Sequence, residues 1–198
     1  MSAYQLITAP VIEPITRSEA KMQLDIPSSE TYFDSLIDSL ITSSRMTVEQ
    51  LTYRGLLTQT WDLWIDEADF LGDIVEISKV PIQSISYVKY YDSTNTLTTL
   101  STDNYRTDLV SSNSPARIQF INKPNVYNRI NAVVIRFVCG WSSAAAIPEP
   151  IKQAQKLILR HLYDNRSDVV TGGKPATIPM GAQYLLNPYS LNWFYKSV

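Results

Sequence analysis

Apolar positions near the N-terminus repeat with the period of a helix. The T-x-x-E sequence at Thr16 and Glu19 is a capping box, in which the two residues satisfy each other's free backbone N–H groups. This box predicts a short helix over about 17–25, and Pro27 ends it.

A second, longer helix is predicted after this proline. Ser28 or Ser29 is the expected N-cap, and Gly55 is the expected stop near Arg54. The apolar positions that follow the 3.6-residue period are Phe33, Leu36, Ile37, Leu40, Ile41, Val48 and Leu51. Because Ser and Thr lower the helix propensity of this stretch, tertiary packing must hold it.

The apolar period changes to two after Thr58. In 59–66 the residues Trp61, Leu63 and Ile65 occupy alternate positions, which is typical of a half-buried strand. Further strands are predicted at 74–79, 82–92, 98–100, 105–110, 117–120 and 132–138. No helical stretch separates them, so the pattern indicates an antiparallel sheet or a small barrel rather than βαβ units.

Helical spacing returns after Pro148 and Pro150 and continues to about Asn165. The predicted fold class is therefore α+β: a small helical bundle with an inserted antiparallel β subdomain and an extended C-terminal arm. We expect a single domain over 1–166, with helices at about 16–54 and 148–166 and a β insertion at about 56–141. Residues 167–198 form the expected arm.

The predicted arm is irregular in pattern but apolar in composition. Gly172 and Gly173 predict a hinge. The apolar and aromatic residues that follow are Tyr184, Leu185, Leu186, Pro188, Tyr189, Leu191, Trp193, Phe194 and Tyr195. Such a tail either folds back on its own domain or docks on a partner, and the residues alone leave both possibilities open. The hinge and the aromatic side chains favour an arm that docks.

Composition and charge exclude several classes of protein. The chain has 198 residues, 18% of them charged, and a formal net charge of −2. It therefore offers no strong attraction for nucleic acid or for an anionic membrane, and a dedicated DNA reader is disfavoured. The N-terminus lacks the features of a signal peptide and no apolar run is long enough to span a bilayer, so we expect a protein of the cytoplasm or of a particle assembled there.

The side chains that usually carry chemistry are few. Cys139 and His161 are single, so neither a disulfide nor the usual zinc cage is expected. His161 with Asp164 could suggest a general base, but no nucleophile motif accompanies them, and a helix-flank histidine is the preferred interpretation. Carboxylates are densest at Asp62, Asp66, Glu67, Asp69, Asp73 and Glu76, and their spacing fails the EF-hand pattern.

Two further patterns also fail as binding sites. Gly172-Gly173-Lys174 lacks the earlier glycine of a phosphate-binding loop. The basic residues of the β region are dispersed and indicate an ordinary mixed surface: Arg117, Lys123, Arg129 and Arg136. We therefore expect no catalytic residue, no cofactor and no metal.

The order and spacing of many short segments resemble the head-tail connector proteins of long-tailed bacteriophages, the adaptor or head-completion family. The resemblance covers nearly the whole chain, and Leu57-Thr58-Gln59-Thr60-Trp61 is its most specific stretch. The other matching segments are Glu13-Pro14-Ile15-Thr16, Glu19-Ala20-Lys21, Leu24, Ile26, Val48-Glu49, Thr52, Arg54, Pro81-Ile82-Gln83-Ser84-Ile85, Tyr90-Tyr91-Asp92, Pro115-Ala116-Arg117-Ile118, Phe137-Val138-Cys139-Gly140-Trp141, Ile147-Pro148, Pro150-Ile151, Tyr163, Asn165-Arg166, Pro179, Gly181, Leu185-Leu186 and Pro188-Tyr189. The chain departs from the family pattern at Ser190, where a basic residue is common.

This resemblance implies a virion structural protein at the neck, the head-tail interface, assembled in the host cytoplasm. It implies a ring of about twelve copies beneath the portal that extends the DNA channel, so that genomic DNA passes without sequence-specific binding. The portal protein and a head-closure (stopper) or other neck or tail protein are the implied partners, and no membrane is involved. The arm would reach the portal. Two alternatives remain: a neck or tail-completion protein that contacts the tail, and a small packaging-associated hydrolase.

Overall fold

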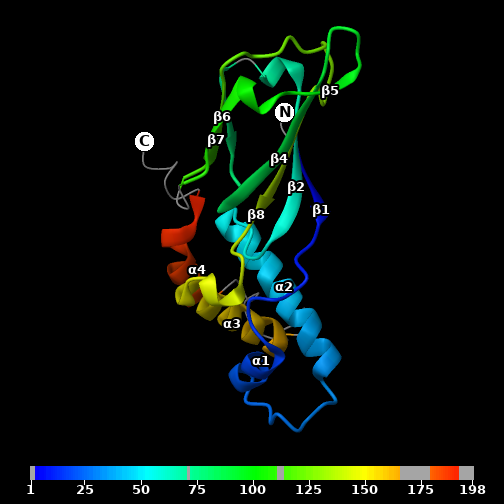
Figure 1. Ribbon diagram of the computed structural model, residues 1–198. Helices are drawn as coiled ribbons and strands as arrows, with labels where there is room; N and C mark the ends of the chain where they lie inside the picture. Colours follow the sequence, from blue (N-terminus) through cyan, green and yellow to red (C-terminus); the bar gives the residue numbers. More distant parts are fainter. Residues whose placement is uncertain (1–2, 71, 111–113, 166–178, 192–198) are drawn as a thin grey trace, which may run out of the picture. The chain divides into compact units, whose positions relative to one another are not determined.

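The computed structural model describes residues 3–70, 72–110, 114–165 and 179–191. The chain divides into two compact units. A β unit comprises Met1–Val11 and Leu57–Trp141, and a helical unit comprises Ile12–Leu56 and Ser142–Val198. The α+β fold class predicted from the sequence is confirmed, with helices and antiparallel sheets both present (Figure 1).

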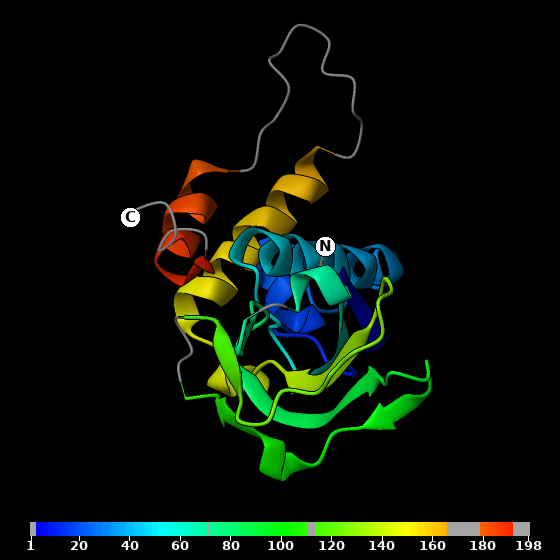
Figure 2. The same cartoon turned by 90° about the horizontal axis from the view of Figure 1, so that it is seen from above.

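The helical unit contains α1 (Arg17–Gln23), α2 (Asp34–Thr52), α3 (Glu149–Asp164) and α4 (Met180–Leu186). Short 3₁₀ turns, η3 (Ala144–Ala146) and η4 (Asn187–Tyr189), flank the last two helices. The first three helices share an apolar core, and α4 lies alongside α3 (Figure 2). The buried members of that core are Ile15, Ala20, Leu24, Ile37, Ile41 and Leu159.

The predicted capping box of α1 is confirmed. The backbone N–H of Thr16 donates to Glu19 Oε2 at 2.7 Å, and the N–H of Glu19 donates to Thr16 Oγ1 at 3.2 Å.

Both ends of α2 differ from the sequence-based expectation. The helix begins at Asp34 rather than after Ser28 or Ser29. The reason is that the Lys21 ammonium donates to the carbonyls of Ser28 and Glu30, which holds these residues in a loop. The helix ends at Thr52, and its C-cap is Tyr53 rather than a residue at Gly55: Tyr53 adopts the left-handed conformation, with φ of 58°, and its N–H donates to the Glu49 carbonyl.

The β unit contains two antiparallel sheets. The larger has the order β1-β2-β8-β4-β5, and the smaller has the order β3-β7-β6. Their bounds are β1 (Ala3–Thr8), β2 (Gln59–Ile65), β3 (Ile74–Ile77), β4 (Ile82–Tyr91), β5 (Leu97–Thr99), β6 (Tyr105–Asp108), β7 (Ala116–Phe120) and β8 (Val133–Cys139), with 3₁₀ turns η1 (Glu67–Asp69) and η2 (Thr102–Asn104). The seven strands predicted from the sequence correspond to β2–β8, whereas β1 was not predicted.

The Tyr4 side chain packs inside the larger sheet and links it to the segment that follows the smaller sheet's strand β3. The Tyr4 ring on β1 packs edge-on against Phe137 of β8, with 6.3 Å between ring centroids. Its hydroxyl accepts a hydrogen bond of 2.9 Å from the backbone N–H of Ser78, one residue after β3. Burial of this side chain raises the pKa of Tyr4.

Segments that carry the family resemblance meet at Gly140. Its N–H donates to the Pro81 carbonyl at 2.8 Å, and its own carbonyl accepts from Gln83 Nε2 at 2.8 Å. The same amide nitrogen of Gln83 donates to Thr58 Oγ1. Leu57 and Trp141 form a parallel bridge beside this glycine. Three sequence segments with no obvious connection are therefore neighbours in the fold.

Candidate docking segment

Part of the predicted arm lies within the described residues and is helical. Residues 180–191 form α4 and η4 and continue to Leu191. The predicted hinge residues Gly172 and Gly173, and the arm residues Trp193, Phe194 and Tyr195, lie outside the described residues.

The inner face of this segment is buried in the helical unit. Ala182, Leu186 and Leu191 are 0%, 2% and 3% exposed. The sequence predicted irregular structure here because of Pro179, Gly181 and Pro188. In the structure Pro179 precedes the first helical residue, where its missing N–H breaks no helical hydrogen bond. The described part of the arm is thus folded back on its own unit.

Arg54 fixes the end of this segment to the end of α2. Its side chain is almost fully buried, and Arg54 Nε donates to the Tyr189 carbonyl at 2.5 Å. A second hydrogen bond joins Ser190 Oγ to the Leu51 carbonyl at 3.2 Å. Burial lowers the pKa of Arg54 to about 10, which leaves the guanidinium protonated at neutral pH. A buried arginine therefore holds Tyr189, and the Leu51 carbonyl holds the neighbouring Ser190.

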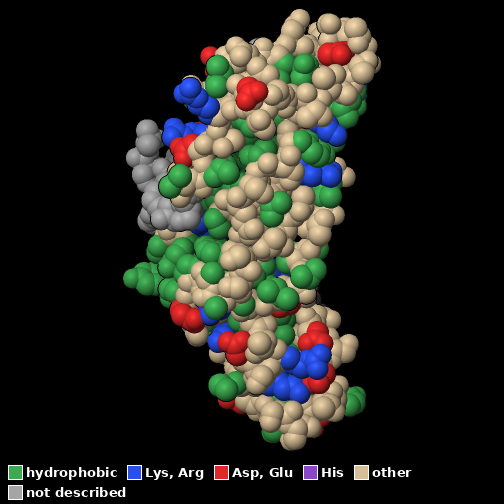
Figure 3. Space-filling view, in the orientation of Figure 1, with side chains coloured by type: hydrophobic (Ala, Val, Ile, Leu, Met, Phe, Trp, Pro, Cys, Tyr) green, Lys and Arg blue, Asp and Glu red, His purple; other side chains and the backbone are tan. Residues whose placement is uncertain are grey.

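The outer face of α4 is apolar and exposed. Met180 and Tyr184 are 84% and 78% exposed, and Pro188 is exposed as well. These residues are spaced four apart, so on α4 Met180 and Tyr184 share one face of the helix. Figure 3 shows hydrophobic side chains gathered on the surface over α4. We call Met180, Tyr184 and Pro188 the outer apolar face.

The side chains that the sequence offered as candidates for chemistry form hydrogen bonds and ion pairs with neighbouring residues. Asp62 is paired with Arg136 by two hydrogen bonds of 2.7 Å, and Asp66 Oδ1 accepts from the backbone N–H of Asn131. His161 Nδ1 lies 3.3 Å from Asn165 Nδ2, whereas Asp164 accepts from Arg160. In the described part of the chain, no group of three or more His, Cys, Asp or Glu residues could hold a metal ion.

Two further observations concern the single cysteine and the length of the helices. Cys139 is fully buried on β8. Among the described helices, none is long and apolar enough to cross a membrane.

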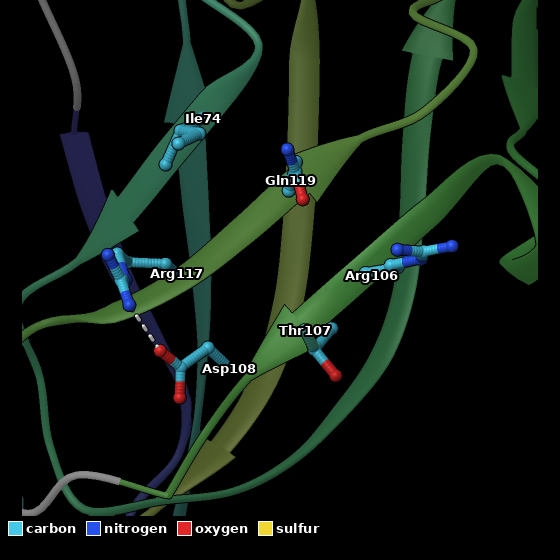
Figure 4. Close-up of a pocket in the computed structure, with 6 residues that line it drawn as sticks. All are labelled: Ile74, Arg106, Thr107, Asp108, Arg117 and Gln119. Carbon is cyan, nitrogen blue, oxygen red and sulfur yellow. Dashed lines mark hydrogen bonds and ion pairs between the residues drawn. The ribbon is translucent and has the colours of Figure 1, made fainter.

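Arg117 on the smaller sheet is paired with a neighbouring carboxylate. A depression of about 210 Å³ on the smaller sheet is lined by six residues: Ile74, Arg106, Thr107, Asp108, Arg117 and Gln119 (Figure 4). Within it Arg117 Nη2 pairs with Asp108 Oδ2 at 2.6 Å, and Glu76 lies opposite Arg117 in the ladder. The hydrogen bond from Arg117 holds the pKa of Asp108 below its usual range. A phosphate would have to compete with two carboxylates for this arginine.

Two other basic residues stack on aromatic rings. The Arg129 guanidinium lies 3.8 Å from the Tyr91 ring centroid, and Lys123 Nζ lies 4.7 Å from that of Phe70. Together with the paired Arg117 and Arg136, they form the mixed surface that the sequence predicted.

The fold defines a class of protein: an α+β chain in which a helical unit is interrupted by an antiparallel β unit. No protein-family model matches the chain, and no curated protein sequence does. Solved structures, however, share this fold over nearly their whole length.

These structures come from gene transfer agent (GTA) particles. A chain in the virion of the native GTA particle has a TM-score of 0.74 and 19% identity, with 94% of each chain covered. A chain in the neck of the empty particle, computed with C6 symmetry, has a TM-score of 0.74, 18% identity and 95% coverage of both chains. A chain in the neck of the native particle, computed with C12 symmetry, has a TM-score of 0.72, 20% identity and coverage of 95% of this chain and 94% of that chain. The chain has the fold of these neck and virion chains, which agrees with the resemblance found in its sequence.

Proposed function

We propose that this protein is a structural component of the neck of a phage-like particle, without a catalytic role. The observation that carries the proposal is the shared fold with neck chains, at 94–95% coverage of both partners. The surroundings of His161 and of the acidic segment support a structural role, because their hydrogen bonds and ion pairs serve local structure.

In this proposal the protein is a head-tail connector (adaptor) that forms a ring of about twelve copies beneath the portal protein. The ring extends the DNA channel and provides the platform for a head-closure or other neck or tail protein. A net charge of −2 and locally paired arginines suit a channel through which genomic DNA passes without sequence-specific contacts. The C12 and C6 symmetries of the solved neck structures support the ring.

We assign portal binding to the C-terminal arm, and within its described part to the outer apolar face. Exposed apolar side chains at helical spacing are suited to insertion into a partner's groove. Leu186 and Leu191 belong to the same predicted arm but hold it on its own unit. Removing 184–198 would therefore also remove buried core residues, and substitutions of exposed side chains make the better test.

Replacing Met180 and Tyr184 together by serine should weaken portal binding at least about tenfold, because exposed aromatic and Met side chains are typical interface anchors. The measurement is the dissociation constant for purified portal rings, with thermal unfolding as the check on folding. Met22→Ser with Tyr32→Ser is the matched control, since these side chains are 77% and 85% exposed in the same unit.

Portal binding that is unchanged in the Met180/Tyr184 variant would contradict this assignment. Loss of tail attachment with portal binding intact would instead identify a tail-contacting neck protein. Cross-linking in assembled particles, with the partner identified by mass spectrometry, separates these two outcomes.

A further inference from the structure

The larger sheet of the β unit has two open edges. β1 and β5 stand at the ends of the order β1-β2-β8-β4-β5, and neither pairs with a further strand among the described residues. β1 forms one border of the sheet in Figure 1. Open edges carry unpaired backbone donors and acceptors, and proteins normally protect them with charged side chains, proline or bulges.

The two sheets differ in how their edges are protected. Both edge strands of the smaller sheet are charged: β3 contains Glu76, and β6 contains Arg106 and Asp108. Neither edge strand of the larger sheet, Ala3–Thr8 (AYQLIT) or Leu97–Thr99 (LTT), contains a charged residue. Leu6 and Leu97 are each 44% exposed on these strands. A register shift between Leu6 and Thr8 is an irregularity of the kind that protects an edge, and it leaves Ala3–Leu6 as the regular, open part of β1.

We propose that a second copy of this chain covers these edges, with β5 of one copy pairing with β1 of the next. This inference rests on the proposed ring and names one of its subunit contacts. Each edge strand has backbone N–H and C=O groups on its outer side, and these groups can form hydrogen bonds with those of another edge strand.

Strand direction decides between two modes of pairing. Every neighbouring pair from β1 to β5 is antiparallel, so β1 and β5 run in the same direction. Pairing β1 with β1 of another copy would close a two-fold dimer and leave both β5 edges open. Pairing β5 with β1 of the next copy is parallel and head-to-tail, and in a closed ring it covers β1 and β5 of every copy, whereas the part of β4 that β5 does not reach, residues 82–87, stays at the edge.

The contact is short, because β5 has three residues and the regular part of β1 ends at Leu6. It therefore fixes the orientation of neighbouring β units and adds to other contacts in the ring. Its sensitivity to charge follows from its shortness: one lysine occupies a large share of the paired length.

Lysine substitutions on full-length protein test the contact. Leu6→Lys and Leu97→Lys should each raise the concentration needed for half-maximal ring assembly on portal at least about tenfold, since a buried ammonium is costly. Ile74→Lys is the matched control: Ile74 is 50% exposed on β3, an edge strand of the smaller sheet, and its variant should assemble as the wild type does. Normal assembly of both edge variants would overturn the proposal.

Cysteine pairs test the same contact without adding charge. Gln5→Cys is combined in one chain with Leu97→Cys, Thr98→Cys or Thr99→Cys, and portal-bound rings are oxidised. One of these pairs should give a ladder of covalent multimers, because a disulfide needs Cα atoms within about 7 Å. The native Cys139 is buried and serves as the background.

Failure of the proposed function is distinguishable from failure of the contact. Portal-bound rings that give no ladder with any pair, or Gln5→Cys alone giving covalent dimers, would overturn the edge pairing and leave the function standing. A wild-type chain that neither binds portal nor forms rings would overturn both.

Discussion

Replacing Gly140 by alanine should destabilise the β unit by at least about 3 kcal/mol. Gly140 has a φ of +99°, a conformation that residues with a Cβ rarely adopt. A Cβ at this position would lie 2.1 Å from the carbonyl oxygen of Leu57 and 2.3 Å from its carbonyl carbon. Because these are backbone atoms of a neighbouring segment, no rotamer change relieves the overlap.

The measurement is the free energy of unfolding from denaturant titration. Gly72→Ala is the matched control, because a Cβ there would lie 3.7 and 3.8 Å from the backbone oxygen and nitrogen of Ile74, an ordinary contact. We expect the control to differ from wild type by less than about 0.5 kcal/mol. Equal stability of the two variants would show that Gly140 does not hold Leu57 at this distance in solution.

Distant segments of the sequence that carry the resemblance are in contact at Gly140. Leu57-Thr58 precedes β2, Phe137 to Trp141 comprises the end of β8 and the two residues after it, and Pro81-Ile82-Gln83 starts β4. Backbone hydrogen bonds and the Gln83 side chain connect all of them at this glycine. The residues that carry the resemblance here thus take part in one packing arrangement.

The strands were predictable where one face is buried. β7 alternates buried and exposed positions from Ala116 to Phe120, and this pattern is visible in its sequence. β1 was missed because five of its six positions are exposed, so its residues show no alternation. The position of β8 between β2 and β4 was not predictable either, because the pairing joins residues far apart in the chain.

The arm shows a different limit of sequence reasoning. Its apolar residues were correctly singled out, but sequence pattern did not separate those that face inward from those that face solvent. Burial divides them: Leu186 and Leu191 pack inside the helical unit, whereas Tyr184 is exposed. Arg54, which donates a hydrogen bond to the Tyr189 carbonyl of this segment, lies more than a hundred residues earlier in the chain, so sequence pattern could not reveal the contact.

Replacing Arg54 by alanine should destabilise the helical unit by about 3 kcal/mol. The side chain is 1% exposed, so its removal leaves a cavity and deprives the Tyr189 carbonyl of the donor Nε. Hydrogen exchange of the amides of 180–191 should become faster, because the segment loses its hydrogen bond from Arg54 and keeps the bond from Ser190 to Leu51 at the end of α2. The measurements are denaturant unfolding and hydrogen exchange on the full chain.

Arg160→Ala is the informative control, because it removes a guanidinium that has more charged partners. Arg160 pairs with Asp25 at 2.8 Å and with Asp164 at 2.9 Å, but its side chain is 38% exposed and those carboxylates are 83% and 51% exposed. Solvent screens such pairs, so we expect a loss below about 1 kcal/mol. Unchanged exchange at 180–191 in Arg54→Ala would contradict the anchoring role.

The two faces of α4 then give separable effects on portal binding. Met180→Ser with Tyr184→Ser removes the outer apolar face but keeps Leu186 buried, so binding should weaken while exchange protection of 180–191 is retained. Arg54→Ala keeps the outer face but weakens the attachment of the segment, so binding should weaken only together with protection. If binding and protection changed together in both variants, the outer apolar face would owe its effect to folding rather than to contact with the portal.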